Sequence, residues 1–465
     1  MPEPVLPQVK NIVFLMLENR SLDNLLGWLY KDSTPNYFYP PNSPQRYDGL
    51  EVGKYSNPDT SGNLVDVIPI SDTVWNNGQG NAVPSTDPYE ALRAYPVDVR
   101  APLRSWYGVM NQFFGNQQVI SGLPSSNSGV PAMKGFLQDY SSYWDNEPHD
   151  VLWTYTPAQA KVINALARQY AVSDRWFCSL PSDTGPNRAY SICGTSLGRE
   201  SNEILWPPPE PPFNGVKTIF EWLAGAENPK SWGIYFSDMY YGGKSYTECL
   251  FPQLKSGGEL ALIETFYDRA RGKIGKDGKP LELPAFSYIE PKWTTPGIPH
   301  VVTLQEGTDY HPNAHICLGE QFLYNVYKAV TEGPQWKRNE TLFIITFDEH
   351  GGTYDHVGPQ WGAIPPDDKK GENGFKFDMF GARISTILIS PYVRPGTVFR
   401  APEGSAHDFD HTSFIATILK WAGVPLSEVA GQSKRVLCAP TFEGVFADKV
   451  VNTETVTTQP WQCKS

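Results

Sequence analysis

The sequence predicts an α/β protein with a single doubly wound, mostly parallel sheet that is flanked by helices and carries long loop insertions. Apolar runs of strand length alternate along the chain with segments whose apolar residues fall at helical spacing. Polar residues follow several of these runs directly, and in open α/β sheets ligands bind at the carboxyl ends of the strands. The chain contains no internal repeat. We expect residues 1–465 to form one domain, with a core at about 11–425, loop-rich insertions at about 31–88 and 200–300, and a tail at about 426–465.

The first strand is predicted at 11–17, where NIVFLML is continuous, apolar and partly β-branched, as in a buried parallel strand. Leucines at helical spacing follow at 22–29. A helix is predicted at 156–171, with Thr156 as N-cap and Pro157 at its first position. Further strands are predicted at 172–180, 341–347 and 384–390, and further helices at 319–331 and 411–422.

The composition excludes several classes of protein. The chain has 38 Lys and Arg against 50 Asp and Glu, a formal net charge of −12, and no basic run, which argues against general nucleic-acid binding. The negative net charge is still compatible with a small anionic substrate if a metal supplies positive charge at the site. The 40 Gly and 42 Pro residues make up about 18% of the chain, below the roughly 25–30% typical of low complexity. Six cysteines without CxxC spacing form no disulfide framework and fix no redox compartment.

The N-terminal residues lack the basic start and long apolar stretch of a signal peptide. No apolar run approaches the roughly 18 residues of a membrane span, so no integral membrane segment is predicted. As written, the chain is expected to be soluble and cytoplasmic, and secreted or periplasmic if a leader was removed. Exposed aromatics in the long loops leave peripheral membrane contact open.

Polar side chains gather where predicted strands end. The first strand is followed by Glu18 and Asn19, another by a turn with Thr184, and a third by Asp348 and Glu349. Any one pair alone is typical of a helix cap or a solvated turn. Three such strand ends together favour a site for a divalent cation such as Mg²⁺, Ca²⁺, Mn²⁺ or Zn²⁺, since these are hard oxygen ligands.

Histidines and a hydroxyl add a second indication. Five of the eight histidines lie between residues 300 and 356, and in DEHGGTYDHV two glycines between His350 and His356 indicate close approach of the backbone to another group. Thr184 is the candidate nucleophile, because a hydroxyl that is held by a metal or a base can attack an electrophile. Asn187 and Arg188 follow it and are candidates to donate hydrogen bonds to an anionic substrate.

Seven segments in order along the chain carry a family pattern: NIVFLMLENRSLDNLLG (11–27), VSDRWFCSLPSDTGPNRAYSICGTS (172–196), EP (290–291), HP followed by GE (311–320), TLFIITFDEHGGTYDHV (341–357), ISTILISPYVRPGTV (384–398) and DFDHTSF (408–414). With these segments the chain resembles the bacterial and plant phosphoesterase family, which contains non-specific phospholipases C and acid phosphatases and belongs to the alkaline phosphatase superfamily. The resemblance runs from residue 11 to about 425 and implies an alkaline-phosphatase-like fold.

The resemblance also implies roles for individual residues. Thr184 would contact the metal and attack phosphorus to form a phospho-enzyme, and Asn187 would hold the phosphoryl oxygens. The other metal ligands would be Glu18, Asn19, Asp348 and Glu349. The candidates for substrate contact, leaving-group protonation or support of the metal ligands would be His350, His311 and His356.

Three positions depart from the family pattern. Asn24 stands where the family usually has His, Arg104 opens a segment that usually reads His-Ser-Trp, and Gly185 replaces a bulkier residue. The predicted metal ligands are unaffected, whereas the substrate pocket is expected to differ. His149 is an alternative protonating residue.

The sequence therefore predicts a metal-dependent phosphoric ester hydrolase, phospholipase C-like or acid phosphatase-like, that acts on a small phosphate ester or a phospholipid. One alternative is a biosynthetic relative that uses the same metal and Thr on a phosphonate, a sulfate ester or another small metabolite. The other is a non-catalytic binding protein that retains the fold.

Overall fold

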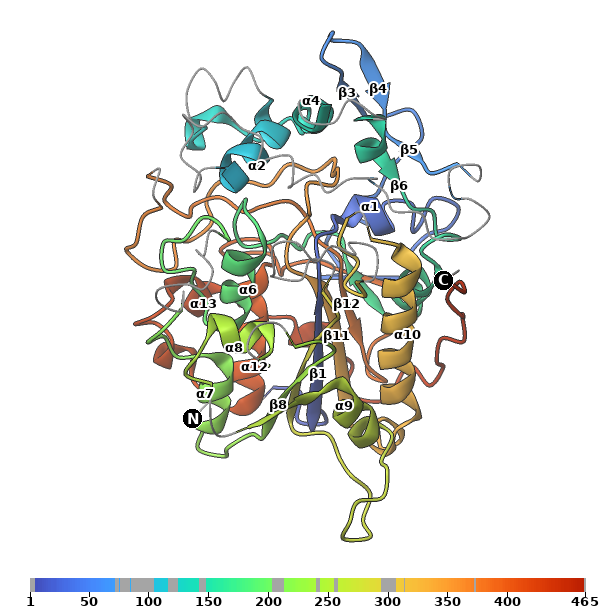
Figure 1. Ribbon diagram of the computed structural model, residues 1–465, viewed down its shortest axis with the longest axis vertical. Coiled ribbons are helices and arrows are strands. Elements are labelled where there is room, and N and C mark those ends of the chain that lie inside the picture. Colours follow the sequence, from blue (N-terminus) through green and yellow to red (C-terminus); the bar gives the residue numbers. More distant parts are fainter. Residues whose placement is uncertain are drawn as a thin grey trace.

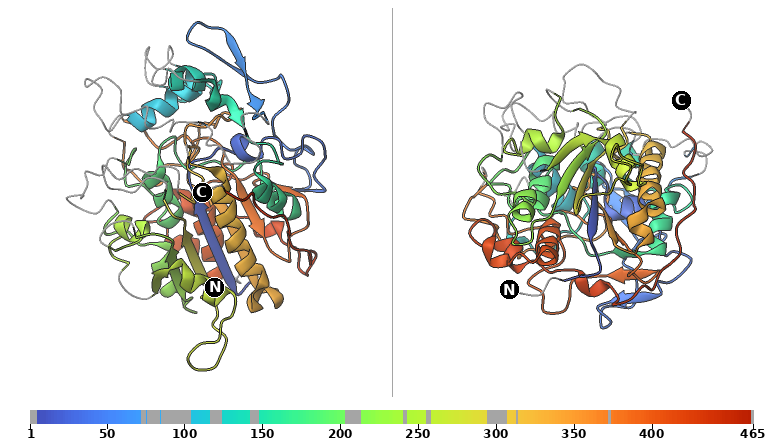
Figure 2. Two further views of the ribbon diagram at one scale, coloured as in Figure 1. Left: turned by 45° about the vertical axis from the view of Figure 1, so that its right-hand side comes forward. Right: turned by 90° about the horizontal axis from the view of Figure 1, so that it is seen from below.

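A nine-stranded sheet runs through the centre of the protein, with helices on both faces (Figure 1, Figure 2). The computed structural model describes residues 5–71, 75, 84, 104–115, 124–141, 148–202, 213–239, 243–254, 258–293, 307–312, 314–371 and 374–463. The strand order is β2-β13-β7-β12-β11-β1-β10-β8-β9, and β12 is antiparallel to both of its neighbours while the other pairs are parallel. The predicted α/β class with a mostly parallel sheet is confirmed.

The sheet contains nine of the strands in the described part of the chain: β1 (Asn11–Leu17), β2 (Tyr37–Tyr39), β7 (Ala171–Ser173), β8 (Trp232–Phe236), β9 (Glu259–Leu262), β10 (Phe286–Glu290), β11 (Thr341–Phe347), β12 (Thr386–Ile389) and β13 (Thr397–Phe399). Two small two-stranded sheets are formed by β3 (Ser56–Pro58) with β4 (Leu64–Asp66) and by β5 (Ile68–Pro69) with β6 (Trp153–Thr154).

The helices of the described residues are α1 (Leu22–Leu26), α2 (Arg104–Phe114), α4 (Phe136–Ser141), α5 (Lys161–Gln169), α6 (Thr184–Ile192), α7 (Ile219–Ala224), α8 (Tyr246–Leu250), α9 (Ile263–Ala270), α10 (Ile316–Glu332), α11 (Pro334–Lys337), α12 (His411–Ala422) and α13 (Lys434–Cys438). Short 3-10 helices lie at Ser126–Ser128, Pro148–Leu152, Leu426–Glu428 and Glu443–Val445. None of these helices is both long and apolar enough to cross a membrane.

The pairing of β1 with β11 sets the position of the predicted site. All residues of both strands are buried, as expected for strands covered by helices on both faces. The strands are parallel and in register from Asn11 opposite Thr341 to Leu17 opposite Phe347. They therefore end at the same level, and the polar residues that follow each strand emerge side by side.

One predicted helix and one predicted strand have different bounds in the structure. The helix predicted at 156–171 begins at Lys161, because Gln159 accepts a hydrogen bond from the Thr156 N–H (2.9 Å) and holds a turn there. The first N–H groups of α5 donate instead to Glu320 of α10. The strand predicted at 172–180 ends at Ser173, since the Asp174 carboxylate turns toward Arg400 and takes the chain out of the sheet.

The predicted insertion at 200–300 is wrong over much of its length. Residues 219–290 contain α7, β8, α8, β9, α9 and β10, and three of these are strands of the main sheet. Their aromatic runs are short and lack a clear period, so the sequence alone did not separate them from loops. Within 31–88, β2 joins the edge of the main sheet and β3, β4 and β5 pair elsewhere.

The C-terminal segment is tied to the sheet layer by a disulfide bond between Cys317 of α10 and Cys463. The sequence had paired no cysteines. Arg435 of α13 is fully buried and donates hydrogen bonds to the backbone oxygens of Ser179 (2.7 Å) and Ile364 (2.5 Å). Within the residues predicted as a tail, Arg435 is thus packed against the segment before α6 and against the segment after β11.

Candidate active site

The turns after β1 and β11 are joined by backbone hydrogen bonds to one carboxylate. Asp348 Oδ1 accepts from the N–H of Asn19 (3.1 Å) and from the N–H of Glu349 (2.7 Å). Asn19 has a φ of +62°, in the left-handed region, which Asn tolerates better than most residues. Glu18, Asn19, Asp348 and Glu349 are all buried. The structure therefore brings these four predicted residues together.

The backbone at Gly351 shows why one of the two positions after His350 has to be a glycine. Its φ is +62°, and a Cβ at this position would lie 2.1 Å from the backbone oxygen of Asn19. The close approach predicted from the Gly-Gly pair is therefore made to the first strand's turn. Its N–H also donates to Glu349 Oε2 (2.6 Å).

Thr184 lies at the first position of α6, and not in the turn that the sequence predicted, because the helix begins directly after its N-cap residue Asp183. The Thr184 hydroxyl donates to Asn19 Oδ1 (3.4 Å), and its side chain is 8% exposed. The N-terminus of a helix carries partial positive charge and favours anions. The candidate nucleophile thus faces the β1 turn at a position suited to a phosphoryl group.

Arg188 lies one turn further along α6 and is buried beneath the site. Its Nε donates to Asp348 Oδ2 (3.1 Å), and its Nη2 lies 3.7 Å from Glu18 Oε1. The guanidinium also stacks over the Trp293 ring at 4.7 Å. Arg188 was predicted to contact the substrate; its contacts instead hold two carboxylates of the site.

The carboxylates of the site are crowded electrostatically. Burial raises the pKa of Glu18 well above its usual range, and Asp348 and Asp309 raise that pKa further against the opposing effect of Arg188. Burial also raises the pKa of Asp348, which Arg188 counters. A divalent cation would relieve this repulsion.

The donor set fits such a cation. Three carboxylates, one amide oxygen and one hydroxyl are the hard oxygen ligands that Mg²⁺, Ca²⁺ and Mn²⁺ prefer, and Zn²⁺ also accepts carboxylates. These residues are Glu18, Asn19, Thr184, Asp348 and Glu349.

Asn187 has a different place from the one predicted. Its amide donates to the backbone oxygens of Leu180 (3.2 Å), Ser182 (2.9 Å) and Asp183 (3.1 Å), and its Oδ1 accepts from the Leu180 N–H (3.2 Å). The two amide hydrogens are thus engaged with the turn that leads into Thr184. Asn187 orders this turn and does not present its amide to a phosphoryl oxygen.

His350 is fully buried beside Glu349. Its Nδ1 lies 3.5 Å from Glu349 Oε2, and its Nε2 bonds Gln112 Oε1 of α2 (2.9 Å). Burial lowers the pKa of His350 to about 3, so the ring is neutral. His350 is thus a neutral ring packed beside Glu349.

His311 lies near Asp348, whose pKa it lowers. Its side chain is 7% exposed, and its Nδ1 bonds the Pro312 carbonyl oxygen (2.9 Å). Because a carbonyl oxygen only accepts, Nδ1 carries the hydrogen and Nε2 is the nitrogen that exchanges a proton. His411 at the start of α12 bonds the Asp348 backbone oxygen through Nε2 (2.6 Å). The sequence had not assigned it to the site, although its DFDH motif marked the segment.

His356 lies in a separate cluster with Asp23, Asp48 and Arg383. Its Nδ1 is 2.7 Å from Asp23 Oδ2, and its Nε2 is 3.3 Å from Asp48 Oδ1. Within the described residues, Asp23, Asp355 and His356 form a group close enough to hold a metal ion. Arg383 pairs with both Asp23 and Asp355, each at 2.9 Å, as Arg188 pairs with Asp348 and Glu18 in the other cluster. The cluster around Asp348 differs in that Asn19, one of its members, bonds the hydroxyl of Thr184.

The departures from the family pattern have distinct positions. Asn24 is buried, where its Oδ1 accepts from Arg20 (3.1 Å) and its amide donates to the Trp153 carbonyl (3.3 Å). Arg104 begins α2, and its side chain lies outside the described residues, as does His300. His149 is exposed on a short 3-10 helix.

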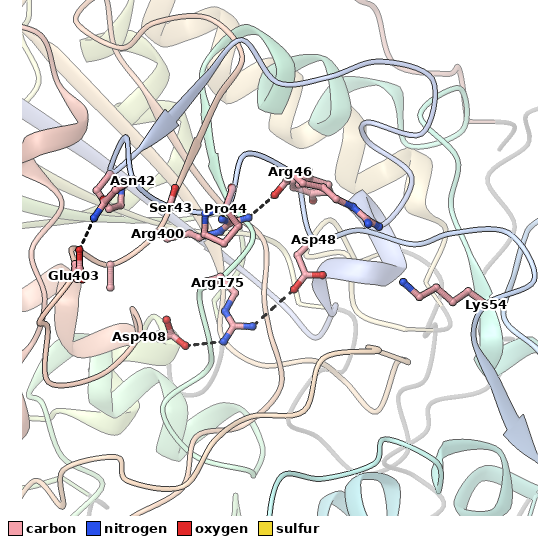
Figure 3. Close-up of a pocket in the computed structure, with 13 residues that line it drawn as sticks. Asn42, Ser43, Pro44, Arg46, Asp48, Lys54, Arg175, Arg400, Glu403 and Asp408 are labelled. Carbon is pink, nitrogen blue, oxygen red and sulfur yellow. Dashed lines mark hydrogen bonds and ion pairs between the residues drawn. The ribbon is translucent and has the colours of Figure 1, made fainter.

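A hollow of about 700 Å³ lies at the carboxyl ends of β2, β13 and β7 (Figure 3). Arg175 bonds Asp408 there (3.1 Å) and approaches Asp48 (3.8 Å). Its lining includes Arg400, which pairs with Asp174 (2.7 Å). Asp48 connects this hollow to His356, and none of the predicted site residues lines it.

The family model and the related sequences agree in pointing to the phosphoesterase family. The model of the phosphoesterase family matches residues 9–425. Non-specific phospholipase C1 of Arabidopsis thaliana is 32% identical over 453 residues, which cover 96% of this chain and 72% of that protein. Phospholipase C B of Mycobacterium tuberculosis is 25% identical over 464 residues, covering 90% and 74%.

Solved structures resemble the chain more distantly. A protein of the alkaline phosphatase superfamily from Vibrio parahaemolyticus aligns with a TM-score of 0.30 and 13% identity, covering 56% of this chain and 60% of that one. A phosphonate monoester hydrolase from Silicibacter pomeroyi aligns with a TM-score of 0.30 and 11% identity, covering 64% and 73%.

Proposed function

The chain belongs to the phosphoesterase family and is a phosphoric ester hydrolase, and from this premise we propose that it acts through Thr184 and a divalent cation. The observation that carries the proposal is the meeting of Thr184 with the paired turns after β1 and β11. The Thr184 hydroxyl bonds Asn19, and Asn19 in turn bonds Asp348. Both halves of the chain supply the site, so we propose that residues 1–465 act as one unit.

The cation would be held by the oxygens of Glu18, Asn19, Thr184, Asp348 and Glu349. When bound, it supplies positive charge that favours the ionised hydroxyl and the negative phosphoryl oxygens. Its identity among Mg²⁺, Ca²⁺, Mn²⁺ and Zn²⁺ is left to experiment. The chain's own part is to hold these oxygens in place, and Arg188 does so from beneath through Asp348 and Glu18.

In the proposed reaction, the Thr184 hydroxyl loses its proton to solvent and its Oγ attacks phosphorus. The bond from phosphorus to the ester oxygen breaks, so that a phosphothreonine forms and the ester oxygen leaves as an alcohol. The N-terminus of α6 attracts the anionic phosphoryl group to Thr184. His311 gives its Nε2 proton to the leaving oxygen, and in the second step it takes a proton from the water that releases the phosphate. Of the three predicted histidines, His311 is assigned this step because it lies near Asp348 while retaining an exposed edge.

The substrate is proposed to be a phospholipid or a small phosphate ester. Relatives at about 30% identity are named non-specific phospholipases C, which supports a diester substrate with a lipid leaving group. A phosphonate or sulfate ester is the competing substrate, because Asn24 occupies a position where the family usually has His. Membership of the phosphoesterase family and the presence of the proposed nucleophile and oxygen ligands argue against a non-catalytic binding role.

Replacement of Thr184 by Ala tests the proposal. The purified protein is assayed with each divalent cation on p-nitrophenyl phosphate, p-nitrophenyl phosphocholine, p-nitrophenyl sulfate and phosphatidylcholine vesicles. We expect metal-dependent turnover of at least one phosphate ester by the wild type and a loss of about 10³-fold or more in the variant. Thr397→Ala in β13 makes the same change at another buried threonine and should keep wild-type turnover. Full activity of the Thr184→Ala protein would exclude the proposed nucleophile.

A further inference from the structure

Two residues outside the sequence motifs, Gln112 and Asp139, hold His350 through consecutive hydrogen bonds. Gln112 of α2 accepts a hydrogen bond from His350 Nε2 (2.9 Å), and the Gln112 amide donates to Asp139 Oδ2 of α4 (3.0 Å). All three side chains are buried, with Gln112 1% and Asp139 5% exposed. In Figures 1 and 2, α2 and α4 lie above the carboxyl end of β1, on the side of the sheet where the candidate site lies.

The direction of the Gln112 amide follows from its partners. An ionised Asp139 only accepts, so the Gln112 NH₂ group faces it and Oε1 faces His350. The His350 Nε2 must then carry a hydrogen, and the other ring nitrogen, Nδ1, faces Glu349 Oε2 at 3.5 Å. In the neutral ring Nδ1 then carries a lone pair, so Gln112 turns an acceptor toward the Glu349 carboxylate. A cation bound beside Glu349 would relieve the repulsion between these two acceptors.

The ring has little freedom to turn by other means. Phe113 and Phe136 pack against it, with ring centroids 5.7 and 6.1 Å away. The His350 backbone oxygen accepts from the N–H (3.0 Å) and from the hydroxyl (2.6 Å) of Thr353. These contacts fix the ring's place, whereas Gln112 alone among them fixes the orientation of its two nitrogens.

We propose that Gln112, anchored by Asp139, is a positioning residue that keeps the lone pair of His350 Nδ1 turned toward Glu349 and so favours the binding of a cation beside that carboxylate. The inference rests on the proposed function, because Glu349 is taken as a metal ligand there. Partners that orient metal ligands typically contribute about 10- to 100-fold to metal affinity or activity. Gln112 acts through His350 and Glu349 and touches no substrate in this account.

The test compares three variants at pH 8, above the pKa of about 7 to which burial raises the Asp139 carboxyl. Gln112→Met removes the amide with little change in volume. The double variant Gln112→Glu, Asp139→Asn exchanges amide and carboxylate, so that the carboxylate introduced on α2 can accept from both His350 Nε2 and the new amide on α4. Gln138→Met makes the first change on a partly exposed glutamine of α4 that bonds the Asp59 carbonyl.

The readouts are cation affinity by titration calorimetry, kcat and KM on p-nitrophenyl phosphocholine, and the His350 Nε2–H signal in ¹⁵N-histidine spectra, assigned with His350→Asn. We expect Gln112→Met to lose about 10- to 100-fold in cation affinity and kcat, with KM changed less and the Nε2–H signal shifted. The double variant should recover to within about threefold, and Gln138→Met should match the wild type.

Wild-type cation affinity in Gln112→Met, or failure of the folded double variant to recover, would overturn the inference. The melting temperature of each variant identifies loss of folding. Absence of cation binding or turnover by the wild type would instead refute the proposed function itself, so the two failures are distinguishable.

Discussion

Replacing His356 by Gln separates a structural role of this histidine from the catalytic role that the sequence suggested. His356 links three distant parts of the chain through Asp23 (2.7 Å) and Asp48 (3.3 Å), with Arg383 3.3 Å from its Nδ1. Burial disfavours its charge, but Asp23 and Asp48 outweigh burial and raise the pKa of His356 to about 9. The imidazolium is therefore part of an ion-pair network near the hollow of Figure 3.

The size of the effect follows from this pKa. The difference between about 9 and the usual value of about 6.5 corresponds to about 3 kcal/mol of favourable interaction with the protonated ring. Because the pKa is raised on folding, this stabilisation is complete below about pH 6.5 and is lost as the pH rises through about 9. The wild type should thus exceed His356→Gln by about 3 kcal/mol at pH 6 and by little at pH 10.

Urea-induced unfolding at pH 6, 8 and 10 measures the difference, with activity assayed on the folded variant. His407→Gln is the control, because the hydrogen bond of its ring goes to a backbone carbonyl, that of Asp408 (2.7 Å), and not to a carboxylate. We expect kcat of His356→Gln to stay near that of the wild type. A stability difference that does not change with pH, or a large loss of kcat in a fully stable variant, would refute the structural role.

Arg188→Met removes the guanidinium that two buried site carboxylates share. Without metal, we expect the free energy of unfolding to fall by about 3–5 kcal/mol, and an added divalent metal ion should restore part of this loss. Equal stability of variant and wild type in calorimetric scans would contradict this. Gly351→Ala places a Cβ 2.1 Å from a backbone oxygen, so we expect the free energy of unfolding in urea to fall by about 2 kcal/mol or more. Gly404 also has a positive φ, +81°, but open space around it, so Gly404→Ala should lower the free energy of unfolding by only about 1 kcal/mol. Cys463→Ser removes the disulfide and should lower the free energy of unfolding by about 2–4 kcal/mol. Dithiothreitol should destabilise the wild type by the same amount and should not destabilise the variant further. Cys438→Ser, at an exposed cysteine, should leave the unfolding curve unchanged.

The central strands could be predicted from the sequence because burial on both faces demands an unbroken apolar run. Six apolar residues in a row precede Glu18, and five of the seven residues that precede Asp348 are apolar; the structure places both segments as neighbouring buried strands. The α12 helix was also predicted at its observed bounds, 411–422, where Asp410 caps its start and Gly423 its end. By contrast, β8 and β10 are short and aromatic, and the sequence offered no period by which to recognise them.

Glu18, Asn19, Asp348 and Glu349 could be predicted to lie together because they directly follow two neighbouring strands. The partners of His356 come from residues 23, 48 and 383, so their convergence is a property of the tertiary fold. Gln112 shows the same limit, because it lies outside the family segments in the sequence and its proposed role depends on where α2 lies above the sheet. Asn187 and Arg188 were correctly placed beside Thr184 in sequence, but on α6 their side chains point into the supporting structure.

Capture of the covalent intermediate tests the central claim most directly. The protein is mixed with p-nitrophenyl phosphate and a divalent cation, quenched in acid within the first turnover, and digested for mass spectrometry. We expect phosphate on Thr184, absent in Thr184→Ala and absent when the cation is chelated. Turnover with phosphate on another residue, or with no covalent phosphate at any quench time, would contradict it.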